Sequence, residues 1–264
     1  MRQLTNEEIS ILEVQSCWAE DWTNIHVSED FKPNYMHRVM LYGEIHIGDF
    51  EKNIEVSRGF LKHSGINNYT IGDDCYISNV SAMETTEGAT YGEGNLISVL
   101  NEVGDGNVIL FSDLNSQLAA FMVKHFNDRA LKDQLRRLIN EDIARHRSDQ
   151  AYIGNHVKII NTREVNNTIV HDDCEINGAS RLSDCTILST PAANVYIGTG
   201  VICENTIISE GSSSTNSVKM QDCFVGEACH ISNGFTASTS IFFANAYMSN
   251  GEACAAFCGP FTSS

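Results

Sequence analysis

The chain has 264 residues, 42% of them hydrophobic, and a formal net charge of −17 at pH 7. That hydrophobic content excludes wholesale disorder. The acidic balance argues against nucleic acid and against anionic membrane surfaces as partners, because both bind basic faces. The polar N-terminus lacks the pattern of a signal peptide, and no segment approaches 18 consecutive apolar residues. We therefore expect a cytoplasmic protein that binds neither nucleic acid nor membrane.

The N-terminal segment is expected to be helical. Thr5 and Glu8 have the spacing of a capping box, and the apolar residues that follow predict a helix over 5–22. Trp18 and Trp22 lie four residues apart and could pin this helix to a larger body.

A second helical region follows a turn-rich stretch. Two β-rich runs, 96–100 and 108–111, flank Gly104-Asp105-Gly106 and predict a hairpin. Residues 113–147 then predict two helices, with Asp113 as the first N-cap and a break at Asn127-Asp128. We expect the apolar stripe of these helices to pack across a face of the main body or against a partner chain. Its members are Leu118, Phe121, Leu135 and Leu138.

The rest of the chain is repetitive. Five segments align without gaps, those that begin at Ile71, Ile153, Val170, Ile197 and Val225. In each, the first position is Ile or Val and the fifth is Cys or Val. Inward positions recur every six residues, which fits neither a helix nor a simple alternating strand. This period predicts short strands, three to a coil, with coils stacked into a parallel β-helix; a generic β-sandwich is the alternative.

This register predicts the environment of four cysteines. Cys75, Cys174 and Cys229 share the fifth position of their segments. We expect these three, together with Cys185, to be buried and reduced, because small thiols suit the interior of a coil.

With the register Ile-Gly-x-x-[Cys/Val]-x, the chain resembles the hexapeptide-repeat superfamily over residues 40–81 and 152–259. Its members are left-handed parallel β-helices and include acyltransferases, the acetyltransferase half of N-acetylglucosamine-1-phosphate uridyltransferases, and γ-class carbonic anhydrases. Five stretches look more specifically like a family of larger proteins often labelled as UDP-N-acetylglucosamine pyrophosphorylase-related or as transferases. These stretches are Leu4–Ile9 with Ala19–Trp22, Ile97–Glu102, Asn177–Leu182 and Cys258–Thr262.

The expected fold is therefore mainly β, a left-handed parallel β-helix with an N-terminal helix and an inserted hairpin plus helical segment. The expected parts are an N-terminal helical segment (1–38), first β-helix coils (39–81), an insertion (82–151), and further coils (152–264) that continue beyond the chain end. The last repeat begins near Asn250 and no polar cap follows it. An uncapped coil leaves unpaired strand edges, so a second copy is expected to cover this end unless the chain continues, which favours a homo-oligomer.

The resemblance implies an acyltransferase-like enzyme that acts on a nucleotide-sugar or on a small amine or hydroxyl acceptor, with an acyl-CoA as possible co-substrate. A non-catalytic structural or ligand-binding β-helix and a carbonic-anhydrase-like metalloenzyme are the alternatives. Hexapeptide acyltransferases use a histidine as general base, which suits an imidazole with a pKa near neutrality. A small-molecule substrate would then bind beside that histidine.

His171 and His230 are the candidate bases, and Asp172 and Asp173 could orient His171. Either histidine could instead be a solvated corner residue. Arg181 could bind a phosphate or carboxylate, unless it pairs with Asp184. Asn233 lies in the turn after His230 and is a second candidate for substrate binding.

No metal site is predicted. His156, His171 and His230 stand at different positions of their repeats. They should therefore face different sides, which argues against a three-histidine zinc site.

Overall fold

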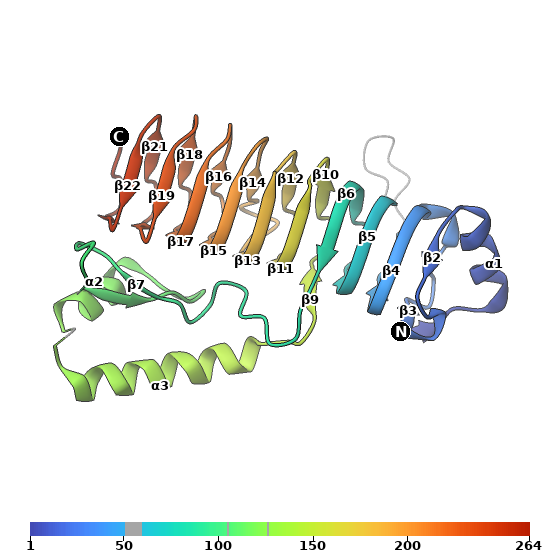
Figure 1. Cartoon of the computed structure of the whole chain (residues 1–264), viewed down its shortest axis with the longest axis horizontal. Helices are drawn as coiled ribbons and strands as arrows, with labels where there is room; N and C mark the ends of the chain where they lie inside the picture. Colours follow the sequence, from blue (N-terminus) through green and yellow to red (C-terminus); the bar gives the residue numbers. More distant parts are fainter. Residues whose placement is uncertain (51–59, 105, 126) are drawn as a thin grey trace.

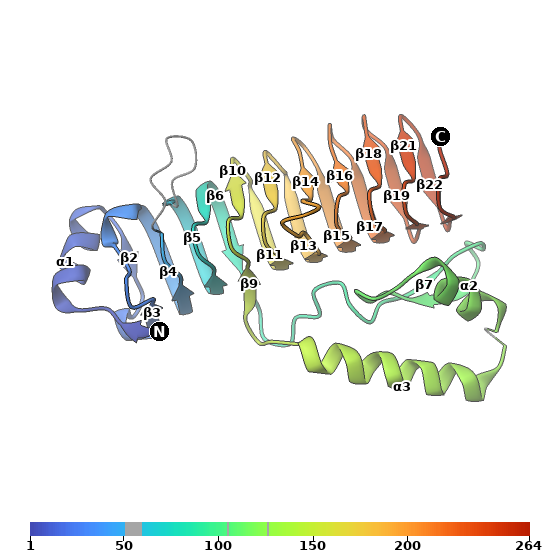
Figure 2. The same cartoon turned by 180° about the vertical axis from the view of Figure 1, so that it is seen from behind.

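The computed structural model describes residues 1–50, 60–104, 106–125 and 127–264. The protein is mainly β, as predicted: within these residues, 21 strands join into one sheet and two more form a separate hairpin. Figures 1 and 2 show a long stack of strands, with α1 at one end and the insert along one side. Within the same described ranges, the structure has no helix with the length and apolar character needed to cross a membrane.

Nearly all strands of the stack run parallel to their neighbours. They are β2 (Trp18–Ala19), β3 (Ile25–Val27), β4 (Met36–Ile47), β5 (Phe60–Ile71), β6 (Tyr76–Glu84), β9 (Ala151–Ile153), β10 (Lys158–Ile160), β11 (Glu164–Val170), β12 (Glu175–Asn177), β13 (Arg181–Ile187), β14 (Tyr196–Ile197), β15 (Ile202–Ile208), β16 (Ser213–Ser214), β17 (Lys219–Val225), β18 (His230–Ser232), β19 (Thr236–Ser238), β20 (Ile241–Phe242), β21 (Tyr247–Ser249), β22 (Glu252–Cys254) and β23 (Phe257–Cys258). Most of them have two to seven residues, and β4, β5 and β6 are longer. One further strand, β1 (Arg2–Gln3), pairs antiparallel with β3.

Buried side chains of paired strands line up in three columns. The first column contains Ile47, Ile71, Ile153, Val170, Ile187, Ile208, Val225 and Phe242. The second contains Ile77, Ile159, Ile176, Ile197, Ser214, Ile231 and Met248. The third contains Ile66, Met83, Val165, Leu182, Cys203, Met220 and Ala237. All of these residues are buried.

The columns correct one part of the predicted repeat alignment. Ile71, Ile153, Val170 and Val225 share the first column, whereas Ile197 belongs to the second. The same Ile-Gly phrase precedes turns on more than one side of the stack, so the phrase alone does not fix which side a segment occupies.

The predicted burial of the four cysteines is confirmed. Cys75, Cys174, Cys185 and Cys229 are all buried and carry free thiols. Cys75 and Cys174 lie at the same register position, with Val157 between them. Burial raises the pKa of Cys75 to about 12 and that of Cys229 to about 11, so these thiols stay protonated near neutral pH.

The N-terminal helix is shorter than predicted. α1 (Asn6–Val14) has the predicted capping box but ends at Val14 rather than at residue 22. Ser16 then turns with φ +62, and β2 begins at Trp18, because pairing with β4 competes with further helix. Trp22 packs against the core, at the start of the short 3-10 helix η1 (Trp22–Asn24). A second 3-10 helix is η2 (Pro33–Tyr35).

The insert contains the predicted hairpin and helices: β7 (Leu96–Ser98), β8 (Asn107–Ile109), α2 (Ser116–Lys124) and α3 (Arg129–His146). β7 and β8 pair antiparallel; Asp105 of the predicted turn lies outside the described residues. The N-cap of α2 is Asn115, not Asp113, because the Asn115 side chain accepts from the Leu118 N–H at 3.0 Å.

The predicted packing of the apolar stripe is correct for two of its four residues and wrong for the other two. Leu118 and Leu135 do pack against the hydrophobic cluster of the insert, but Phe121 and Leu138 are exposed. Met122 is buried in that cluster instead. The hairpin lies nearer the stack than α3 does (Figures 1 and 2), so the helices meet the hairpin and their buried face is set by it.

Candidate functional site

A cavity of about 350 Å³ lies between the stack and the insert. From the stack it is lined by Tyr152 of β9, Ile169 of β11 and Thr186 of β13, which lie on successive strands. The remaining lining residues are His171, Leu188, Thr90, Tyr91, Glu93, Ser112, Asp113, Asp142, Ile143 and Arg147. The cavity thus has one wall from the repeats and one from the inserted segment.

Apolar packing fixes the insert beside this cavity. Outward residues of the later strands join one hydrophobic cluster with the insert; they are Ile207, Phe224, Ile241 and Phe243. Two hydrogen bonds add to this packing: Thr186 Oγ1 donates to the Tyr91 carbonyl at 2.7 Å, and the Leu100 N–H donates to the Ala255 carbonyl at 2.6 Å. The insert therefore covers one end of this side of the stack and leaves the cavity where the covering ends.

Gly92 allows the close approach of the two walls. It has φ +80, and a Cβ atom there would lie 2.7 Å from the carbonyl oxygen of Asp184 and 3.1 Å from the backbone nitrogen of Thr206. No real side chain fits so close to backbone, so a glycine is required next to Tyr91.

His171 is the imidazole that faces the cavity. It follows the last residue of β11, and its backbone N–H donates to the Ile187 carbonyl at 2.9 Å. Its Nε2 lies 2.7 Å from the hydroxyl oxygen of Tyr152, with ring centroids 5.3 Å apart. The backbone hydrogen bond fixes the position of the residue, and the phenol contacts the ring.

Asp172 does not orient the ring as predicted. Its Oδ1 accepts from the Asn155 N–H at 2.7 Å, above Gly154. The carboxylate thus satisfies a backbone N–H group of the neighbouring turn. Tyr152, which sequence analysis did not select, takes the orienting role instead.

Burial sets the charge state of this pair. It lowers the pKa of His171 below its ordinary value, and the nearby Asp172 carboxylate opposes the shift only in part. Burial, helped by Asp172, raises the pKa of Tyr152 to about 12. At neutral pH the pair is thus a neutral imidazole beside a protonated phenol, which is the state that a general base requires.

A second cavity, of about 410 Å³, shares His171, Leu188, Ser112 and Asp113 with the first. Its other residues include Glu210 and Glu227. With Asp113, the carboxylates that line it are three. Clefts lined by charge of one sign concentrate ligands of the opposite sign. The first cavity also has three carboxylates, those of Glu93, Asp113 and Asp142, but Arg147 lines it as well, whereas neither Lys nor Arg is among the residues that line the second. His171 therefore stands between a cavity of mixed charge and an acidic groove that favours cations.

The chain matches, over residues 1–68 and 63–264, the family described as a domain of unknown function (DUF4954). It belongs to that family. No curated protein matches the chain. Because the description of the DUF4954 family names no chemistry, we infer function from the geometry of the site.

The other predicted site residues of this DUF4954 chain lie outside the linings of the two cavities. His230, on β18, has its Nδ1 2.8 Å from Ser213 Oγ and stands beside the Tyr247 ring. Arg181 pairs with Glu204 rather than with Asp184. The structure therefore does not bring these residues together with His171.

Asn233 occupies a corner turn. Its backbone has φ +53, its amide nitrogen donates to Ser249 Oγ at 3.0 Å, and its Oδ1 accepts from Asn216 at 3.1 Å. Asparagine favours this left-handed conformation, which accounts for the residue without a ligand.

Two groups of functional interest were missed from the sequence. The first is the insert wall, including Arg147, whose signal is the interruption of the repeats at 82–151. The second is His26, Glu44 and His46, whose ligand atoms all lie within 4.8 Å of one another. The signal for that group was present: Ile25-His26-Val27 and Ile45-His46-Ile47 place a histidine at the same position of two strands.

Proposed function

We propose that this protein is an acyltransferase-like enzyme that transfers an acyl group from a thioester of the acyl-CoA type to an amine. The observation that carries the proposal is His171: a neutral, oriented imidazole at the junction of two cavities. A volume of a few hundred Å³ is typical of small-molecule sites.

We further propose that the stack is a left-handed parallel β-helix of the hexapeptide-repeat superfamily. Three columns of buried residues, one from each side of a coil, support this assignment. So does the parallel register in which Ile159 pairs with Ile176, 17 residues on. A coil of about three hexapeptides would produce that shift.

The acidic groove favours an amine over a nucleotide-sugar as acceptor. Asp113, Glu210 and Glu227 would repel a diphosphate and attract an ammonium group. Arg147 lines the first cavity together with Glu93, Asp113 and Asp142, and it is the group there that would pair with an anionic part of the donor. The two cavities would thus hold the two substrates on either side of His171.

The proposed reaction is an aminolysis. The bound ammonium group first loses one proton to solvent. The neutral amine nitrogen then attacks the thioester carbonyl as His171 accepts its second proton; the C–N bond forms, the C–S bond breaks, and the proton passes from His171 to the leaving thiolate. With its own proton on Nε2 and donated to the Tyr152 oxygen, His171 accepts the substrate proton on Nδ1. Tyr152 is then a positioning residue that orients the ring.

The test is release of free CoA by the full chain, supplied with a panel of acyl-CoAs and primary amines. Chromatography should measure the CoA, because the exposed Cys254 would react with thiol reagents. His171→Gln should lower kcat by roughly 100-fold or more, the usual contribution of a general base. His230→Ala, a matched loss of a histidine outside both cavities, should leave kcat unchanged.

Tyr152→Phe separates positioning from binding. Loss of one hydrogen bond of about 1.4 kcal/mol predicts a roughly tenfold lower kcat, with the KM for the amine unchanged. If the panel shifts the melting temperature but no CoA is released, the protein is a ligand-binding module rather than an enzyme. If His171→Gln retains full turnover, the assigned base is wrong.

A further inference from the structure

Two histidines lie side by side on the outer surface of the N-terminal strands. His26 of β3 pairs with His46 of β4 in parallel register. Their neighbours in each strand are buried, and side chains alternate along a strand, so both rings point outward. The ring centroids are 5.1 Å apart and the rings meet edge to face.

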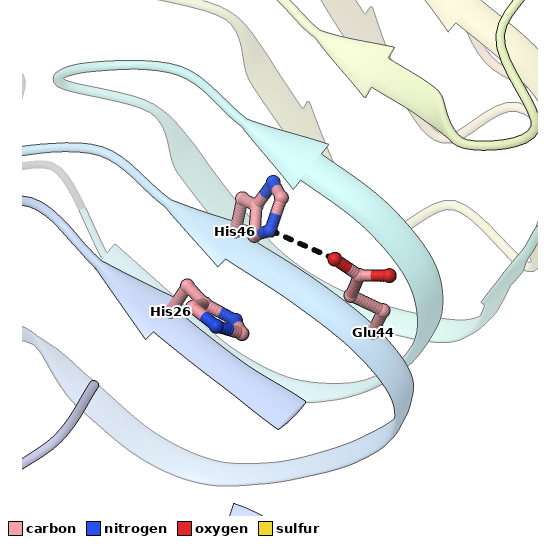
Figure 3. A group of neighbouring side chains, drawn as sticks. All are labelled: His26, Glu44 and His46. Carbon is pink, nitrogen blue, oxygen red and sulfur yellow. Dashed lines mark ion pairs between the residues drawn. The ribbon is translucent and has the colours of Figure 1, made fainter. Parts of the chain in front are cut away.

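Glu44 stands two residues before His46 and on the same side of the strand, as Figure 3 shows. Its Oε1 lies 3.2 Å from His46 Nε2. The backbone of Glu44 is held at both ends: its N–H donates to Asn68 Oδ1 at 3.0 Å, and its carbonyl accepts from Gln150 Nε2 at 2.9 Å. The carboxylate is therefore presented from a fixed backbone.

We propose that His26, Glu44 and His46 bind one divalent transition-metal ion, and that zinc fits best. The three ligand atoms lie within 4.8 Å of one another. Zinc binds imidazole nitrogen and carboxylate oxygen at about 2.0–2.2 Å, a geometry that small side-chain rotations would reach from here. Imidazole ligands favour zinc and its neighbours over magnesium and calcium.

The state of His26 independently supports a ligand. Its Nδ1 is buried and has no hydrogen-bond partner among the described residues. Buried ring nitrogens are normally paired, and an unpaired one calls for an explanation such as a bound ion. The net charge of −17 also favours a cation over an anion at this surface.

The site would be open rather than closed. Three protein ligands leave a fourth position for water or substrate, as in catalytic zinc sites. The side chain of Glu44 is 58% exposed, so solvent reaches the carboxylate side of the site, while His26 Nδ1 is buried. The proposal depends only on β3 and β4 and is independent of the transferase chemistry assigned to His171.

Zinc titration of the full chain by calorimetry, in chelator-free buffer and in a Cys254→Ser background, tests the site. We expect one ion per chain. His46→Ala should weaken the Kd at least about 100-fold, because even loss of an outer-shell partner costs roughly 10–100-fold. His230→Ala is the matched control and should bind zinc as the parent does.

Glu44→Gln guards against a folding artefact, because it keeps the size and shape of an exposed side chain. It should weaken the Kd at least tenfold while the circular dichroism spectrum stays unchanged. Co²⁺ bound to the parent should show visible d–d absorption that His46→Ala lacks. Equal zinc affinity in the parent and His46→Ala, or no saturable binding below millimolar zinc, would overturn the proposal.

Discussion

Replacing Gly92 by alanine should loosen the insert from the stack. The added Cβ would lie 2.7 Å from a backbone oxygen and 3.1 Å from a backbone nitrogen, and neither atom can move without its strand. Gly94, two residues on, is a matched control: its φ is +79 against +80, and its Cβ would meet only Ile143 Cδ1 at an ordinary 3.6 Å. The two variants share the conformational penalty and differ in the clash.

The magnitude follows from these two terms. A side chain in the left-handed region costs about 1–2 kcal/mol, in both variants. Overpacking against rigid neighbours adds roughly 1–3 kcal/mol, in Gly92→Ala alone. Denaturant unfolding should therefore find Gly92→Ala about 2 kcal/mol less stable than Gly94→Ala, and hydrogen exchange should place the lost protection in the insert. Equal stability of the two variants would refute the close approach at Gly92.

Four further predictions concern the cavity, the interior, the thiols and the insert. Because burial lowers the pKa of His171, kcat/KM should decline on the acid side with a midpoint below pH 6.5. A midpoint above pH 6.5 would contradict the assigned base. Tyr69→Phe should cost about 1–3 kcal/mol in urea denaturation, because the buried Tyr69 hydroxyl donates to backbone carbonyls inside the stack; an unchanged midpoint would contradict this. Cys254 should react first with a thiol reagent, since it alone of the nine cysteines is exposed. Rapid labelling of all nine would contradict the strand register that buries the other thiols inside the stack. Replacing 85–150 by a short linker should cause self-association measurable by light scattering, because it uncovers Phe224 and its apolar neighbours; an unassociated variant would show that the insert does not cover them.

Much of the fold could be predicted because the repeats are local. The Ile and Cys positions of each segment depend on a six-residue period, and burial of Cys75 and Cys174 followed from it. The side of the stack occupied by Ile197 could not be predicted, since the excursion before it shifts the chain by a number of residues that no motif reveals. The prediction of where α1 ends was wrong for a related reason: strand pairing of Trp18 with β4 overrides the local preference for helix.

The site was harder to predict than the fold. His171 was identified because imidazole chemistry is recognisable from sequence, and its place beside a cavity agrees with that choice. Arg147 was missed because its relation to His171 exists only once the insert folds back along the stack. Tyr152 was missed although it stands one residue before a predicted repeat segment, and the pairing of β9 with β11 brings it to His171. His26 and His46 are 20 residues apart, and their approach depends on a parallel register that sequence alone did not establish for these strands.

One outward row of side chains accounts for where both sites lie. In strand order it contains His26, His46, Thr70, Tyr152, Ile169, Thr186, Ile207, Phe224, Ile241 and Phe257. The row is polar at the N-terminal end and apolar at the other, and the insert packs on the apolar end. The cavity opens where the row changes character, at Tyr152 to Thr186, because packing ends there and polar groups can face a ligand. The two histidines lie further along the same row, on strands that the insert does not cover (Figures 1 and 2), which leaves them accessible to an ion from solvent.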